Sequence, residues 1–187
     1  MPKSLFLIVL IYLATTVVAH SHPDEYYQID LILFLHQPSP KQDANEIMPP
    51  VLPLSMQHPV KLDKHRESTS LPYKLLPVTA SALRNEYRAI NRQPQYQVLF
   101  FGSWLQTQNS QKGVSFASVL SHDWQAEGVF KIQKRQYFDL DAQLLFKSPD
   151  NQHSSFVLTR HQRLKNNDLY YLDHPQGGML IKIHAPA

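Results

Sequence analysis

The stretch GVFKIQKRQYFDLDAQLLF, residues 128–146, alternates apolar and polar side chains along nearly its whole length. A period of two residues is the pattern of strands with one face buried and the other in solvent, as in many antiparallel sheets. The triplet Lys134-Arg135-Gln136 interrupts the alternation, which either a tight hairpin or a bulge in one bent strand would explain. We favour the hairpin, and the stretch therefore predicts a fold built on antiparallel sheet.

The sequence after this stretch predicts further strands. SFVLTRHQRL, residues 155–164, follows a turn-like segment and is typical of a strand. DLYYLDHPQGGMLIKIH, residues 168–184, places DHPQGG between two apolar runs, which predicts a hairpin. In its turn we expect Asp173 to bond backbone N–H groups, Pro175 to fix φ, and the Gly-Gly pair to allow positive φ.

Two strands are also predicted before residue 128. QIDLILFLH, residues 28–36, is apolar on both faces after Asp30 and is typical of a buried central strand. YQVLFFGSWLQ, residues 96–106, is a second strand, and we expect Trp104 to lie in the core.

One segment has a clear helical period. In TASALRNEYRAINRQP, residues 79–94, the apolar side chains of Leu83, Tyr87 and Ile90 share one helical face. Thr79 or Ser81 can cap the start, and Pro94 stops the helix. We therefore predict an α+β domain: a mostly antiparallel sheet of about six or seven strands with one main helix, 79–92, packed on it.

Residues 37–78 are rich in proline, which prevents helix continuation and pairing inside a sheet. We interpret the segment as a long loop laid over the domain, partly in polyproline conformation. For residues 41–70, disorder is an equal alternative.

The first residues are typical of a signal peptide. Lys3 precedes the apolar run LFLIVLIYLATTVV, and Val17-Val18-Ala19 supplies the small residues before a cleavage site. A membrane anchor is the alternative, but the run is shorter than the ~20 residues that a spanning helix needs. We predict cleavage after Ala19, so residues 1–19 are the signal and 20–187 a single periplasmic domain that does not span the membrane.

Composition excludes several kinds of site. The chain has no cysteine, which excludes disulfides, thiolate metal sites, a Cys nucleophile and a lipid anchor on cysteine. Lysine and arginine total 18 against 15 acidic residues, and the two kinds are interspersed. Because nucleic-acid binding needs a concentrated basic face, we expect no nucleic-acid partner.

The candidates for catalysis and metal binding are weak. Asp173 and His174 are adjacent, so on a strand they point to opposite faces, and the chain has no known nucleophile motif. Of ten histidines, only His161, His174 and His184 could meet, on three strands that might be neighbours. The carboxylates of Asp139 and Asp141 share a strand face, where we expect Arg135, Arg160 or Arg163 to pair with them. We predict no enzyme activity, no metal and no cofactor.

Aromatic residues beside polar ones favour binding instead. Sugar rings stack their C–H faces on tyrosine or tryptophan and bond polar groups at their rims. Arginine can also bind the carboxylates of cell-wall peptides through two parallel hydrogen bonds. The candidate ligand-binding residues are Arg160, Arg163, Tyr171, Asp173 and His174. A periplasmic hydrolase that uses His174, and a protein adaptor that docks through residues 37–78, are the alternatives.

Four motifs, in this order, resemble the CsiV family of periplasmic peptidoglycan-binding proteins. They are a strand with an acidic residue and an LILF core; Y-x-V-L-x-x-x-x-W-x-Q from Tyr96; R-x-Y-F-x-L-D from Arg135; and R-x-x-R, a turn and D-L-Y-Y-L-D-H-P-x-x-G-x-L-I-x-I, from Arg160 to Ile183. The Y-L-D-H-P-x-x-G block is the specific one. The resemblance implies a non-enzymatic protein that binds peptidoglycan and supports wall assembly through a lipoprotein activator of a bifunctional penicillin-binding protein.

Overall fold

The computed structural model describes residues 26–36, 60–62, 73–108, 110, 113–116, 124–148 and 155–186. The predicted signal peptide, and residues 37–59 and 63–72 of the proline-rich segment, lie outside this part of the chain. Within it, no helix is both long and apolar enough to cross a lipid bilayer.

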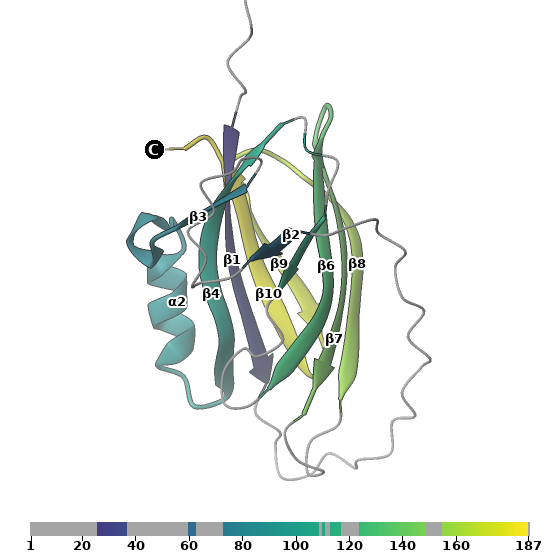
Figure 1. Ribbon diagram of the computed structural model, residues 1–187. Coiled ribbons are helices and arrows are strands. Elements are labelled where there is room, and N and C mark those ends of the chain that lie inside the picture. The colour runs from purple at the N-terminus through teal and green to yellow at the C-terminus, as the bar shows by residue number, and fades with distance from the viewer. Residues whose placement is uncertain are drawn as a thin grey trace, which may run out of the picture.

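The described residues form two five-stranded sheets that face each other (Figure 1). Sheet A has the strand order β3-β4-β1-β10-β9, with the bounds β1 (Tyr26–His36), β3 (Tyr73–Leu76), β4 (Tyr96–Thr107), β9 (Leu169–His174) and β10 (Gly177–His184). Sheet B has the order β2-β5-β6-β7-β8, with the bounds β2 (Val60–Leu62), β5 (Val114–Phe116), β6 (Gln125–Lys134), β7 (Phe138–Lys147) and β8 (Phe156–Leu164). All neighbours are antiparallel except β2 and β5, which are parallel.

The mostly antiparallel character is confirmed, but the single sheet of six or seven strands is wrong. The described residues contain ten strands, and β2, β3 and β5 have only three or four residues each. So short a strand shows no countable alternation, which is why the sequence did not reveal it. The helix is also shorter than predicted, since α2 spans Arg84–Asn91 after the one-turn helix η1 (Val78–Ala80).

The hairpin predicted at residues 134–136 is confirmed. β6 and β7 pair antiparallel around the turn at residues 135–137. The first pair is Gln125 opposite Lys147, and the last is Lys134 opposite Phe138. Their inward side chains, among them Phe130 and Leu140, meet the inner face of sheet A, where Trp104 is fully buried as predicted. Each such side chain contributes about 1.5–3 kcal/mol on burial, so this layer is the main source of stability.

The helix covers the outer face of sheet A, not the inner one, which sheet B covers (Figure 1). Leu83, Tyr87 and Ile90 pack against Ile32 and Phe34 of β1, so the predicted helical face is confirmed. β1 is consequently buried on both faces, as its apolar sequence predicted, because it is the middle strand of sheet A between two layers.

The hairpin of β9 and β10 is confirmed, but the expected role of its glycines is wrong. The turn is Pro175-Gln176, closed by the pair His174 and Gly177. Neither Gly177 nor Gly178 has positive φ. The glycines are needed for close approach instead, because a Cβ on Gly177 would lie 2.5 Å from the backbone oxygen of Phe34.

Candidate functional site

Strand β9 presents a tyrosine and a carboxylate together on the outer face of sheet A. Successive side chains of a strand alternate between faces, so Leu169, Tyr171 and Asp173 share this face while Leu172 points inward. The Tyr171 side chain is 52% exposed, which makes it the most exposed large aromatic residue of the described chain.

The Tyr171 ring is held in place by its neighbours. It lies nearly parallel to the ring of Phe34, with the two centroids 6.1 Å apart and an interplanar angle of 10°. The two rings meet above Gly178 of the intervening strand, where a Cβ would lie 2.9 Å from Tyr171 Cε2 and 3.0 Å from Phe34 Cζ. The absence of a side chain at this position therefore allows the two rings to come together.

Two further rings extend this contact toward the end of β1. Tyr96 lies edge-on to Phe34 at 5.3 Å, and His36 lies 5.6 Å from Tyr96. We call the set Phe34, His36, Tyr96, Tyr171 and Asp173 the Tyr171 surface. Its members come from β1, β4 and β9.

The polar group of this surface is the Asp173 carboxylate. The Tyr171 hydroxyl donates to Asp173 Oδ1 at 2.6 Å. Partial burial of the phenol and this bond to a carboxylate raise the pKa of Tyr171 to about 12. The same bond, helped by the nearby His36 and Arg160, lowers the pKa of Asp173. At neutral pH the surface therefore carries a fixed neutral phenol beside an anionic carboxylate.

Arg160 and His174 lie behind this surface, at the seam where the edge strands β8 and β9 meet. The Arg160 guanidinium donates to the backbone oxygen of Asp173 and, at 2.9 Å, to that of Thr159. The His174 ring stacks on Phe156 of β8 at 4.7 Å, and its Nδ1 accepts the Gln176 backbone N–H at 3.2 Å. The contacts of both residues hold the strand that carries Tyr171.

The structure does not bring Arg163 to the same place. Residues 160 and 163 are an odd number apart on β8, so Arg163 points to the outer face of sheet B. There Arg163 and Arg135 lie 3.5 Å and 3.6 Å from the Asp139 carboxylate, which confirms these two predicted pairs. Asp141 is paired instead with His161.

The three histidines considered as a triad have separate surroundings. His161 contacts Asp141 on sheet B, His174 stacks on Phe156, and His184 contacts Asp30 on sheet A. Among the described residues, no three side chains of the metal-binding kinds are grouped.

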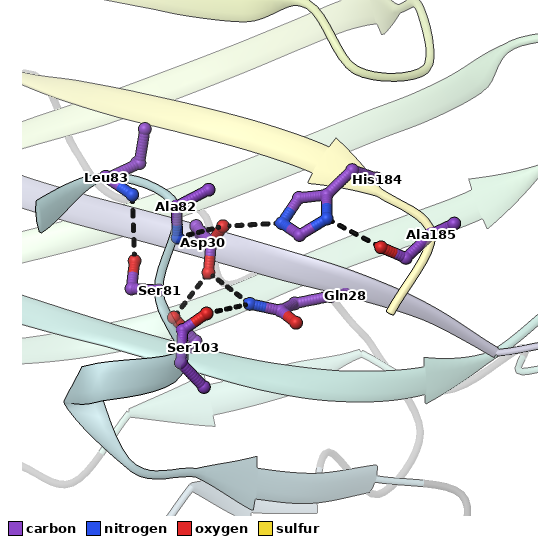
Figure 2. Close-up of polar contacts among 9 residues, drawn as sticks. Gln28, Asp30, Ser81, Ala82, Leu83, Ser103, His184 and Ala185 are labelled. Atoms are coloured by element: carbon purple, nitrogen blue, oxygen red, sulfur yellow. Dashed lines mark hydrogen bonds and ion pairs between the residues drawn. The ribbon is translucent and has the colours of Figure 1, made fainter. Parts of the chain in front are cut away.

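The sequence did not predict a buried polar network around Asp30, on the outer face of sheet A beneath the start of α2 (Figure 2). Asp30 Oδ1 accepts from Gln28 Nε2 at 2.9 Å and from the Ser103 hydroxyl. Asp30 Oδ2 accepts from the Ala82 backbone N–H at 3.1 Å and from His184 Nε2 at 2.7 Å. The fully buried carboxylate therefore has four donors.

This network joins distant parts of the chain. Gln28 Nε2 also donates to the Ala80 backbone oxygen, and His184 Nδ1 lies 2.7 Å from the Ala185 oxygen. Both ring nitrogens of His184 therefore face oxygen atoms, Nδ1 that of Ala185 and Nε2 that of Asp30. An acidic residue in the otherwise apolar run at 28–36 was the one signal in the sequence, since a buried charge requires partners.

The site contains no arrangement that resembles a serine triad. In the network the carboxylate lies between the serine and the histidine, and Ser103 is fully buried. In a triad the histidine lies between the other two and contacts an accessible hydroxyl. The Asp30 network therefore has the geometry of a structural anchor.

Comparison with known proteins agrees with the resemblance noted in the sequence. No curated protein and no solved structure matches the chain. The model of one protein family, described as peptidoglycan-binding protein CsiV, matches residues 4–186, nearly the whole chain. The chain therefore belongs to the CsiV family of peptidoglycan-binding proteins.

Proposed function

We propose that the protein binds peptidoglycan without cleaving it, and that the Tyr171 surface makes the contact. One observation carries the proposal: a half-exposed tyrosine ring is fixed between Phe34 and the Asp173 carboxylate. Membership of a peptidoglycan-binding family supplies the class of ligand.

The chemistry of this surface suits the sugars of the glycan. The exposed face of Tyr171 can stack on the C–H face of a sugar ring, and Asp173 can accept hydrogen bonds from hydroxyl or amide groups at its rim. Because the ring and the carboxylate are already bonded to each other, binding costs little side-chain entropy.

The surroundings of the candidate catalytic residues support the non-enzymatic part of the proposal. The Asp173 carboxylate accepts from Tyr171, and His174 Nδ1 accepts a backbone N–H. A hydrolase dyad needs the histidine oriented by its partner and aimed at a nucleophile. We therefore place Arg160 and His174 in supporting roles, and leave Arg163, on the other sheet, outside the contact.

A sacculus pull-down tests the proposal. We expect the protein without residues 1–19 to sediment with sacculi well above albumin, and Tyr171→Ala to weaken binding about ten-fold, the usual effect of removing a central aromatic anchor. Tyr137→Ala is the matched control, because Tyr137 is 39% exposed but lies on the β6–β7 turn at the opposite end of the molecule (Figure 1). Recovery no better than albumin, or equal losses in both variants, would refute the proposal.

The enzymatic alternative has its own measurement. Incubation with sacculi should release no soluble muropeptides, from either the unchanged protein or His174→Ala. Release that disappears in His174→Ala would establish a hydrolase instead.

We further propose that the protein acts in the periplasm after cleavage of residues 1–19, as one domain, and supports wall assembly through a lipoprotein activator of a bifunctional penicillin-binding protein. This part rests on the family resemblance. Crosslinking in cells, with and without wall digestion, tests it: a crosslinked lipoprotein is expected. Crosslinking to a partner protein that persists when sacculus binding is absent would favour a protein adaptor that does not bind the wall.

A further inference from the structure

Helix α2 carries three arginines on its exposed side. Arg84, Arg88 and its C-cap Arg92 are four residues apart, which places them about 6 Å apart along the axis and within one slanting stripe. All three side chains are exposed. We call these residues the arginine stripe.

The stripe is not neutralised within the part of the chain that the structure describes. None of the three arginines makes an ion pair there, whereas Arg135 and Arg163 on sheet B share Asp139. The one acid of α2, Glu86, points away from the stripe, with its Oε2 buried. The stripe is therefore free to bind an anion from outside.

The first arginine of the stripe, Arg84, works against the stability of its own helix, whereas Arg88 and Arg92 lie near the helix end that favours cations. Like charges four residues apart repel, and a cation in the first turn opposes the positive end of the helix dipole. A side chain selected only for solubility could be acidic at position 84 at no such cost. This cost at position 84 favours a role in binding for the stripe.

The stripe and the Tyr171 surface lie on the same side of the molecule. α2 lies on the outer face of sheet A, and the chain passes from Arg92 to Tyr96 in one turn, closed by the Tyr96 N–H bond to the Gln93 oxygen at 3.1 Å. Because both lie on the outer face of sheet A, a polymer strand that contacts the Tyr171 surface can extend along α2.

We propose that the arginine stripe binds the free carboxylates of peptidoglycan stem peptides. This inference rests on the proposed function and adds a second type of contact, since the anionic Asp173 at the Tyr171 surface repels carboxylates. Guanidinium groups match carboxylates in a two-bond fork, and repeated stems along a glycan present several carboxylates at once. The occupant is therefore the peptide part of the polymer.

The test compares two triple variants of the mature protein on two kinds of sacculi. The stripe variant is Arg84→Gln, Arg88→Gln and Arg92→Gln. The control is Lys131→Gln, Arg135→Gln and Lys165→Gln, which removes the same charge from β6, from the turn after it and from the residue that follows β8. The sacculi are either native or have their carboxyl groups amidated. Unfolding curves of each variant check that it is folded.

On native sacculi at low salt we expect the stripe variant to bind at least about five-fold more weakly than the unchanged protein, and the control to lose less than two-fold, since each exposed ion pair contributes about one- to five-fold. Amidation of the sacculi should weaken binding of the unchanged protein by the same factor. It should leave binding of the stripe variant unaffected. Added salt should reduce the difference between the two proteins.

Three outcomes would overturn the inference. One is equal binding of the stripe variant and the unchanged protein to native sacculi. The second is an equal loss of binding by the unchanged protein and the stripe variant when the sacculi are amidated. The third is unchanged sacculus binding with lost binding to anionic lipid vesicles, which would assign the stripe to a membrane surface. Failure of the unchanged protein to bind sacculi at all would instead refute the proposed function.

Discussion

Asp30 is a charged group inside an apolar layer, and its four donors explain how the fold accommodates it. A buried carboxylate without partners costs several kcal/mol, but here every lone-pair direction is used by a side chain or a backbone N–H. The donors come from β1, β4, β10 and the turn before α2, so one residue fixes the relation of four segments.

Replacement of Asp30 by alanine should destabilise the protein by about 3–5 kcal/mol, because it removes the acceptor of four hydrogen bonds and leaves the Ser103 hydroxyl and the His184 Nε2 without their carboxylate partner. Urea unfolding monitored by tryptophan fluorescence measures the loss. Asp141→Ala is the control, since its partner His161 is exposed and the expected loss is within about 1 kcal/mol. Equal losses in the two variants would contradict the role of the network.

The shifted pKa of Tyr171 predicts a change at high pH. Its folded value of about 12 exceeds the unfolded value of about 10, so the folded state favours the neutral phenol. This contribution to stability is complete below pH about 10 and is lost as the pH rises through about 12.

The cause of the raised pKa of Tyr171 can be tested by removing the Asp173 carboxylate. In Asp173→Asn the pKa of Tyr171 should fall toward 10, because the carboxylate that accepts the bond and repels phenolate is gone, while the burial remains. NMR titration of tyrosine labelled at Cζ measures this, with Tyr171→Phe to assign the signal. An unchanged pKa would show that burial alone causes the shift.

The β9–β10 hairpin depends on two glycines that are needed for different reasons. At Gly177 an added Cβ would meet the backbone of Phe34 at 2.5 Å. At Gly178 its two closest contacts would be ring atoms of Tyr171 and Phe34, and the Leu172 backbone oxygen would lie 3.4 Å away, an ordinary contact distance. Rings can move, whereas the backbone of a paired strand cannot move without loss of its hydrogen bonds.

We therefore expect Gly177→Ala to cost about 2–3 kcal/mol of unfolding free energy and Gly178→Ala about 1 kcal/mol or less. Gly178→Ala should nevertheless weaken sacculus binding, because it displaces Tyr171 from Phe34. Thermal unfolding and the pull-down measure the two effects separately. Full binding by Gly178→Ala would show that the position of the Tyr171 ring does not matter.

The elements with a clear period could be predicted, and those without one could not. The alternation at 128–146 predicted β6 and β7, and the spacing of Leu83, Tyr87 and Ile90 predicted the buried face of α2. Alternation shows that one face of a strand is covered but does not show by what, so the second sheet was missed.

The same rules explain what could be predicted of the site. Tyr171 and Asp173 are two residues apart on a strand, so their shared face followed from the sequence. The odd spacing of Arg160 and Arg163 likewise indicates that the two side chains lie on opposite faces of β8. The pair Asp30 and His184 spans 154 positions and required the strand order.

The two sheets of the whole molecule meet at the edge strands β8 and β9, where Arg160 and His174 connect them. We expect Arg160→Ala to loosen this seam, because the Asp173 backbone oxygen loses its donor from β8. Hydrogen exchange should become faster in β9 and stay unchanged in β6 and β7. Arg163→Ala, on the outer face of the same strand, is the control, and faster exchange in both variants would contradict the role of the seam.

The central place of the last described strand has a consequence for the order in which the protein can be built. β10 lies between β1 and β9, and among the described strands it provides the one sheet neighbour of β9 and one of the two of β1. The ribosome makes β10 after every other described strand, so β1 has β4 as its one described sheet neighbour until residues 177–184 have been made. The order β4-β1-β10-β9 can therefore form only once residues 177–184 are available, and a chain that stops before residue 177 leaves both β1 and β9 without this partner.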